Sequence, residues 1–283
     1  MHPRSVILAV VVAVGLAAVR VAATPVAQSI ASSGKVETYD YFVFTNPAPG
    51  AEDEYNRYYD TQHAADVVSI PGFVTAQRFV AADPPLRNSP VPSKYLIVYK
   101  VVTADLPAVQ AEVVRRIKSG ETVISPVMVS PPDTPSGYYK VISPLIPHQG
   151  PQPSPSRGEA ETYYQFVFSN PTAGTSAAAF NKWYDEIHAG EVVSSPNWIE
   201  AQRGQLMNPP MRPGRTVYNY VIAFKIVTSD LAATWEGYRQ NAQAHPMTAG
   251  PLGENIGVTY KTLGPMLYGD QVRAARAKAG IAK

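Results

Sequence analysis

The sequence contains no cysteine, so the chain has no disulfide, thiolate zinc site, iron–sulfur cluster or cysteine nucleophile. It also lacks a large excess of charge: the formal net charge is +2, and the repeated segments described below carry no lysine- and arginine-rich run. The small net charge and the missing basic run both argue against nucleic acid as a partner. Stability must come from an apolar core, and a hydrophobic content of 45% is typical of a globular protein.

Long hydrophobic runs are also scarce, with one exception near the N-terminus. Residues 6–19 form a 14-residue apolar stretch, which is short for a membrane span but suits the core of a signal peptide. Val21 and Ala23 stand at −3 and −1 of a candidate cleavage site before Thr24. We therefore expect residues 1–23 to be a signal peptide and the protein to be periplasmic or secreted, with no stable membrane insertion after cleavage. An uncleaved anchor is the alternative.

What the chain does contain is a repeat. Residues 55–78 and 180–203 align without gaps at an offset of 125 and share twelve identical positions. In the first window these are Asn56, Tyr59, Asp60, His63, Ala64, Val67, Val68, Ser69, Pro71, Ala76, Gln77 and Arg78. Identity at half of the positions exceeds what shared composition produces, so the sequence predicts a tandem duplication.

The same order of elements is expected in both halves. In the first, the patterns predict strands at 39–45, 73–81, 94–103 and 137–143, and helices at 51–69 and 105–118. In the second, they predict strands at 162–169, 198–207, 216–227 and 257–263, and helices at 175–194 and 230–243. Asp105 and Asp230 are the expected N-caps, and Gly120 follows the second helix of the first half.

These boundaries divide the chain into a first repeat at 36–147, a Pro-rich linker at 148–160, a second repeat at 161–268 and a basic, Ala-rich tail at 269–283, to which we assign no role. The order strand–helix–strand–strand–helix–strand is the ferredoxin-like βαββαβ arrangement, an α+β fold with both helices on one face of a four-stranded sheet. Its other face is apolar and bare. We therefore expect the two sheets to pack together within the chain.

The best candidate for chemistry lies on the first helix of each half. At 100° per residue Tyr59 and His63 are about 40° apart around the helix and share a face. Asp60 and Asp66 flank His63 at three residues on either side. A nearby carboxylate orients an imidazole as a general base, and a tyrosine hydroxyl polarises a developing oxyanion. The second half repeats the pattern with Tyr184, Asp185, His188 and Glu191.

We take the two histidines, the two tyrosines, Asp60 and Asp185 as candidate catalytic residues. A structural pair, copied by the duplication, is the alternative. The spacing Asp-x-x-His-x-x-Asp/Glu also allows two ligands to one metal ion, but His148 and His245 have no counterpart in the other half, so we predict no metal site. If they point inward, Arg78 and Arg203 would bind an anionic substrate or pair with the helix acids; if they point outward, they would be solvated charges at the edge of the sheet.

At these residues the sequence resembles a known family. The string Tyr55-Asn-Arg-Tyr-Tyr-Asp-Thr-Gln-His63, followed by Ile70-Pro-Gly-Phe-Val-Thr-Ala-Gln-Arg-Phe79, is similar to the EthD-like branch of the dimeric α/β-barrel superfamily. Residues 180–203 carry it again, with Pro196-Asn197 in place of Pro-Gly. The resemblance covers residues 39–267. It implies an intramolecular dimeric α/β barrel, a cleft between sheet and helices, and a helix histidine able to act as acid or base.

Members of this superfamily include cofactor-free cyclases, isomerases and monooxygenases, and haem enzymes on the same barrel. We therefore expect a protein that binds a small hydrophobic, aromatic or polyketide-like molecule without a cofactor, with proton transfer by His63 or His188. Aromatics such as Tyr58 and Trp183 would line the pocket. A non-catalytic binding protein is the main alternative. A haem protein with a histidine axial ligand is another. The sequence does not specify further oligomerisation.

Overall fold

The computed structural model describes residues 34–86, 91–150, 158–207 and 217–280. The predicted signal peptide and residues 151–157 of the predicted linker lie outside the described residues. The elements up to the linker are β1 (Glu37–Pro47), α1 (Glu52–Tyr58), η1 (Tyr59–His63), α2 (Ala64–Val68), β2 (Phe73–Ala81), β3 (Tyr95–Thr103), α3 (Leu106–Ser119), β4 (Met128–Val129), β5 (Gly137–Val141) and β6 (Ile146–Pro147).

Beyond the linker the order of the main elements is the same. They are β7 (Glu161–Pro171), α4 (Ala177–Trp183), η2 (Tyr184–His188), α5 (Ala189–Val193), β8 (Trp198–Leu206), β9 (Tyr220–Thr228), α6 (Leu231–Ala244), β10 (Leu252–Tyr268) and α7 (Gly269–Lys278). β10 is longer than the expected strand at 257–263, and β5 is shorter than 137–143.

Eight of the strands form a closed ring. Hydrogen-bonded neighbours run β1–β3–β2–β10–β7–β9–β8–β5 and back to β1, and every pair is antiparallel. The fold is therefore α+β and of the dimeric α/β-barrel type. The halves join at their edges, through β2–β10 and β5–β8, and their inner faces pack together inside the ring, where Phe42 contacts Phe166 and Phe168. Edge pairing satisfies backbone groups that an open sheet would expose.

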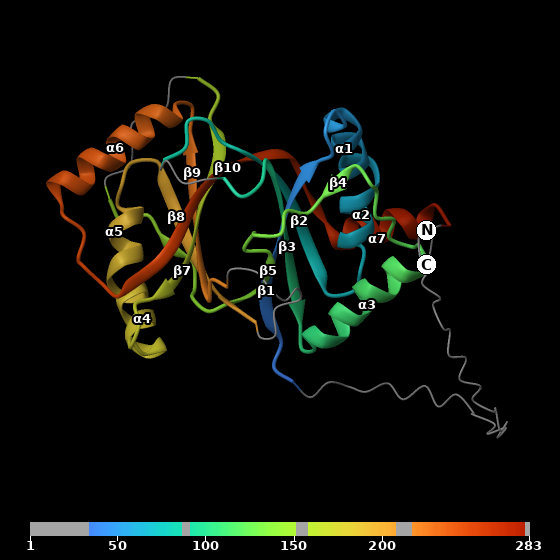
Figure 1. Ribbon diagram of the computed structural model, residues 1–283, viewed down its shortest axis with the longest axis horizontal. Coiled ribbons are helices and arrows are strands. Elements are labelled where there is room, and N and C mark those ends of the chain that lie inside the picture. Colours follow the sequence, from blue (N-terminus) through green and yellow to red (C-terminus); the bar gives the residue numbers. More distant parts are fainter. Residues whose placement is uncertain (1–33, 87–90, 151–157, 208–216, 281–283) are drawn as a thin grey trace, which may run out of the picture. The chain divides into compact units, whose positions relative to one another are not determined.

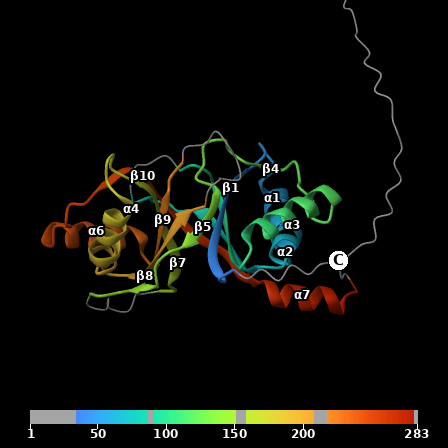
Figure 2. The same ribbon diagram turned by 90° about the horizontal axis from the view of Figure 1, so that it is seen from below.

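The helices lie outside the barrel, in two groups. In Figures 1 and 2, α1, α2, α3 and α7 cover one side of the strands, and α4, α5 and α6 cover the other. Strand alternation explains this division, because successive side chains point to opposite faces. One face packs on the helices in two apolar clusters, around Tyr59 and around Tyr184. The other face turns into the barrel, where Phe42, Phe44 and Phe168 belong to a third cluster.

The second helix of each half begins and ends as the sequence predicts. The Asp105 carboxylate accepts from the Ala108 amide at 3.0 Å, and the Asp230 carboxylate from the Ala233 amide at 2.9 Å, so both aspartates are N-caps. Gly120, in the left-handed region at φ 76°, closes α3. These caps fix the helices over the sheet.

The turn before β2 has the same shape in both halves despite different residues. Gly72 adopts φ +93°, and Asn197, at the matching position of the second half, adopts φ 69°. Asparagine tolerates the left-handed region better than most residues. Its side chain also donates to the Thr234 hydroxyl at 2.9 Å, which ties the turn to α6. The replacement of Pro-Gly by Pro196-Asn197 therefore preserves the turn.

The tail, for which no role was expected, forms α7 and contacts the first half. Arg273 donates to the Val68 carbonyl, at the C-terminal end of α2, at 3.4 Å, and to the Phe73 carbonyl, at the start of β2, at 3.1 Å. Arg276 forms an ion pair with Asp66 and donates to the Ser69 hydroxyl at 3.1 Å. Cations are favoured at this end of a helix. In the described part of the chain no helix is long and apolar enough to cross a membrane.

Candidate functional site

The first helix of each half is interrupted by a π-helical turn at the candidate site. Tyr59–His63 and Tyr184–His188 are the two π segments. In a π turn residues five apart, not four, lie one above the other. Each histidine therefore stacks on the aromatic residue five positions earlier: Tyr58 and His63 have ring centroids 5.0 Å apart, and Trp183 and His188 4.4 Å apart. The predicted partner Tyr59 meets His63 only edge to face, at 5.1 Å.

His63 is buried and hydrogen-bonded to its stacking partner. Its Nδ1 lies 2.8 Å from the Tyr58 hydroxyl, which donates its proton to the Val123 carbonyl at 2.5 Å. The hydroxyl has one proton, so Nδ1 must carry the hydrogen and donate to Tyr58. Burial lowers the pKa of His63 to about 4, against a smaller opposing effect of the Asp66 charge. The imidazole is therefore neutral at physiological pH.

His188 is covered in a similar way by the segment that follows α6. The Trp183 indole stacks on it and donates to the Thr248 carbonyl at 3.3 Å. The Glu191 carboxylate lies 3.7 Å from His188 Nδ1 and accepts from the Thr248 amide and hydroxyl, at 2.9 and 2.6 Å. Tyr58 and Trp183, expected to contact substrate, are thus the stacking partners of the two histidines.

The two candidate tyrosines point into the layer between sheet and helices. The Tyr59 hydroxyl lies 3.3 Å from that of Thr45 and 3.0 Å from the Met128 sulfur, and burial raises its pKa well above the ordinary value. Tyr184 is equally buried. Each ring also lies under an arginine: the guanidinium carbon of Arg78 is 4.9 Å from the Tyr59 centroid, and that of Arg203 is 4.6 Å from the Tyr184 centroid.

Those arginines connect the strand to the helix acids. Arg203 donates to Asp185 at 2.7 Å and to the Asn181 side chain at 2.8 Å. Arg78 makes the same two contacts, with Asp60 and with Asn56. Of the alternatives drawn from the sequence, the pairing with helix acids is therefore the one found. Three of the positions identical between the halves (arginine, aspartate and asparagine) form this clamp, which gives them a structural reason to recur.

The acids expected around His63 are directed elsewhere, because Asp60 pairs with Arg78 and Asp66 pairs with Arg276. In the second half Asp185 pairs with Arg203, and only Glu191 lies beside its histidine, His188. Within the described ranges no group of three histidine, aspartate or glutamate residues is arranged to hold a metal ion. Both imidazoles are covered by neighbouring side chains and line none of the cavities described below. They do not fit the position of a haem axial ligand.

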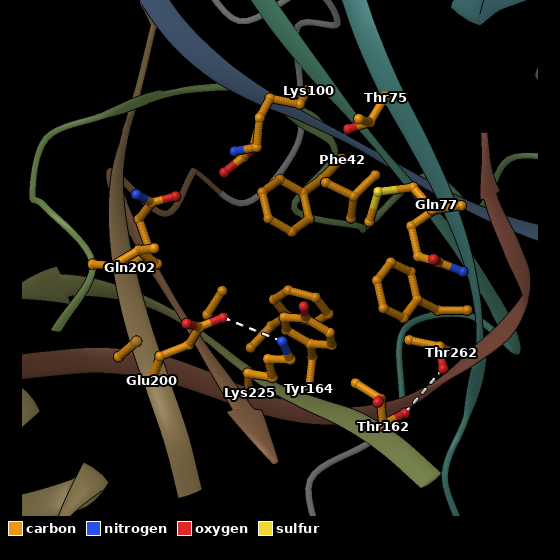
Figure 3. Close-up of a pocket in the computed structure, with 18 residues that line it drawn as sticks. Phe42, Thr75, Gln77, Lys100, Thr162, Tyr164, Glu200, Gln202, Lys225 and Thr262 are labelled. Carbon is orange, nitrogen blue, oxygen red and sulfur yellow. Dashed lines mark hydrogen bonds and ion pairs between the residues drawn. The ribbon is translucent and has the colours of Figure 1, made fainter. Parts of the chain in front are cut away.

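A cavity of about 470 Å³ lies inside the barrel, which we call the lumen. Its lining comes from every barrel strand except β5, and from Leu145, which follows β5. Figure 3 shows side chains converging on it from opposite walls. Its floor is aromatic: Phe42 and Phe79 each meet Phe166 edge to face, at 5.3 and 5.7 Å, and Tyr164 stacks on Phe166 at 5.6 Å. An aromatic floor in a concave site suits a flat apolar ligand.

The mouth of the lumen is polar. Lys100 pairs with Asp40 at 2.7 Å, and Lys225 pairs with Glu200 at 3.4 Å. Gln77 and Gln202, both among the repeated positions, line the same cavity, one step further in than the lysines. Sequence reasoning did not select these residues. The available signal was the continuation of the repeat into 95–103 and 220–228, where the lysine recurs at the same offset of 125.

Two smaller cavities lie on the helix side of the first half. One of about 200 Å³ is lined by Tyr59, Asp60, Arg78 and the β10 segment around Pro265. The other, of about 370 Å³, lies against Tyr58 and the segment 123–126. Four of the predicted site residues (Tyr58, Tyr59, Asp60 and Arg78) therefore border one of these cavities, although His63 does not.

These features define a closed eight-stranded α/β barrel with a ligand-sized lumen. No protein-family model matches the chain, and no curated protein is similar to it in sequence. Its chain path is similar to the crystal structure of an anthrone oxidase-like protein, with a TM-score of 0.47, 12% identity, and coverage of 85% of this chain and 96% of that one. A chlorite dismutase from Candidatus Nitrospira defluvii gives a TM-score of 0.42, 10% identity, and coverage of 87% and 98%. At these scores neither structure assigns a function to the chain.

Proposed function

We propose that the chain is a tandem-duplicated, EthD-like protein of the dimeric α/β-barrel superfamily that binds a small hydrophobic, aromatic or polyketide-like molecule in the lumen. The repeated windows at 55–78 and 180–203 and the recurring order of elements support the duplication. The observation that carries the binding proposal is the lumen, a 470 Å³ cavity with an aromatic floor and a polar mouth. The periplasmic or secreted location stays a prediction, because residues 1–33 are outside the described residues.

Binding in the lumen is tested by filling it. Ala223 lines the cavity wall beside Phe166, its cross-strand neighbour. We expect 9-fluorenone, a flat uncharged aromatic, to bind the wild-type protein in isothermal titration, and Ala223→Trp to weaken this binding at least tenfold. Ala111→Trp, on the exposed face of α3, is the matched control and should bind as the wild type does. Equal affinity in both variants would place the ligand outside the lumen.

A second candidate is proton transfer by His63. The observation in its favour is the hydrogen bond between the neutral, buried imidazole and the Tyr58 hydroxyl, at 2.8 Å, beside the 370 Å³ cavity. For Tyr58 to connect the imidazole to a substrate in that cavity, the imidazole proton must move to Nε2 and the Tyr58 hydroxyl must turn from the Val123 carbonyl to Nδ1, which then accepts its proton. The second half has Trp183 in place of Tyr58 and lacks this hydroxyl, so the first half would hold the working site.

This candidate predicts catalysed exchange of the acidic C–H protons next to an aromatic ketone. We expect the protein to accelerate deuterium incorporation into 1-indanone, followed by NMR, and His63→Gln and Tyr58→Phe to abolish the acceleration. His188→Gln is the matched control in the second half and should retain it. If all variants match the wild type, His63 has a structural role only.

A further inference from the structure

The mouth of the lumen is built from two matching rows of side chains, one from each half. In the first, Lys100 on β3 stands between Asp40 on β1 and Thr75 on β2. In the second, Lys225 on β9 stands between Tyr164 on β7 and Glu200 on β8. The lysine keeps its place in both rows, whereas the acid lies on the first strand in one half and on the second strand in the other.

Each lysine is therefore compensated by one carboxylate, although the two acids occupy different positions of the repeat. Lys100 lies 2.7 Å from Asp40, and Lys225 lies 3.4 Å from Glu200; Figure 3 shows the latter pair. All four side chains are about one-third exposed or less, so water screens them only in part. The formal charge of the four groups is zero. A ligand carboxylate would have to compete with Asp40 and Glu200 for the lysines and would be repelled by both.

The lysines nevertheless retain donors for an uncharged acceptor. An ammonium has three N–H groups, and one carboxylate oxygen engages one of them. The amide of Gln202 and the Tyr164 hydroxyl add further donors in the lining. Burial, then the charges of Glu200 and Asp40, raise the pKa of Tyr164 to about 12, so its hydroxyl stays protonated.

We propose that the lumen selects uncharged aromatic molecules that carry hydrogen-bond acceptors, such as aromatic ketones, and rejects aromatic carboxylates of similar size. This inference rests on the proposed function and specifies its ligand class. The aromatic rings lie on the floor formed by Phe42, Phe79 and Phe166, and the carbonyl oxygen accepts from a lysine ammonium without displacing the carboxylate paired with it.

The test compares 9-fluorenone with fluorene-9-carboxylate at pH 7 by isothermal titration. For the wild-type protein we expect 9-fluorenone to bind at least tenfold more tightly. In a variant combining Asp40→Asn with Glu200→Gln the lysines lose their partners, and the carboxylate should bind at least tenfold more tightly than it does to the wild type. The affinity for 9-fluorenone should change less than threefold. Asp40→Asn alone should give an intermediate gain in affinity for fluorene-9-carboxylate. This single variant tests the proposed selectivity if the double variant does not fold.

A matched control removes two acids from the outer helices, by Asp53→Asn with Glu236→Gln. It should leave both affinities unchanged, since those charges lie outside the barrel. Tighter binding of the carboxylate to the wild type, or no gain in either lumen variant, would overturn the proposed selectivity. If both compounds bind equally well to Ala223→Trp and wild type, or neither binds the wild type, the lumen itself is not the site and the proposed function fails with it.

Discussion

The Nδ1 atom of His63 lies 2.8 Å from the hydroxyl of Tyr58, five residues earlier in the chain. This contact depends on the π turn, which brings the two rings into a stack with centroids 5.0 Å apart. The hydroxyl also accepts from the Ser125 amide at 3.3 Å and donates to the Val123 carbonyl at 2.5 Å. The pair therefore attaches the first helix to the segment that follows α3.

Burial of His63 predicts a loss of stability in acid. The pKa of the folded state, about 4, lies below the unfolded value of 6.5, so as the pH falls the unfolded chain binds the proton first. The stability is fully present above pH 6.5 and is lost progressively down to pH 4. From this group we expect the free energy of unfolding to be about 2 kcal/mol smaller at pH 5 than at pH 7.5, measured by urea denaturation.

The control for this prediction is to remove the titrating group. In His63→Phe the free energy of unfolding should differ much less between pH 7.5 and pH 5. In His245→Gln, at an exposed position after α6, the difference should be that of the wild type. An unchanged pH dependence in His63→Phe would show that other groups cause it.

The arginine clamp predicts a large cost for removing Arg203. Its side chain is 1% exposed, and its loss leaves Asp185 and Asn181 without their donor. Asp185 is 39% exposed and partly solvated, so the loss of the pair and of the contact with Asn181 in Arg203→Met should lower the free energy of unfolding by about 2 kcal/mol. Arg115→Met, at a side chain that is 51% exposed, should have a clearly smaller effect. Equal losses in urea denaturation would argue against the clamp.

Replacement of glycine by alanine should have opposite effects on stability at two positions. A Cβ on Gly250 would overlap the Trp183 indole, so Gly250→Ala must displace the ring that stacks on His188 and should cost about 2 kcal/mol. Gly237 lies within α6, and a Cβ there would meet only Pro196, at 4.0 Å. Gly237→Ala should therefore raise the thermal midpoint, with a gain of about 0.5–1 kcal/mol from helix propensity. A neutral Gly250→Ala would mean that the segment after α6 does not hold the indole.

The contact of α7 with the first half predicts a role for Arg276 in stability. Asp66 has a side chain that is 10% exposed and loses its cationic partner in Arg276→Ala. We expect a decrease of about 2 kcal/mol in the free energy of unfolding. Arg239→Ala, which removes a surface pair with Glu236 on α6, should change it by less than about 0.5 kcal/mol. Similar values for both would leave α7 without a stabilising role.

Local features of the fold followed from the sequence. Asp105 and Asp230 cap their helices as predicted, because an N-cap depends on residues three positions apart. Alternation along β2 puts Thr75, Gln77 and Phe79 on one face, and all three line the lumen. Simple alternation would put Phe73 on that face too, but a register shift between Phe73 and Thr75 turns it toward the helices.

The candidate site was harder to derive. The pairing of Tyr59 with His63 assumed 100° per residue, and the π turn changes that angle, so the true partner is Tyr58. The lumen depends on which edge strands meet, and periodicity gives the faces of a strand but not its neighbours. Lys100 and Lys225 sit in strands that read as apolar, and only the repeat distinguishes them.

The central claim is that a ligand occupies the inside of the barrel. A crystal structure of the protein with bound 9-fluorenone tests it most directly. The account predicts the tricycle in the lumen, stacked against Phe166 and Phe42, with its oxygen near Lys100 or Lys225. Density for the ligand on the helix side of the sheet, beside Tyr58 and His63, would contradict it.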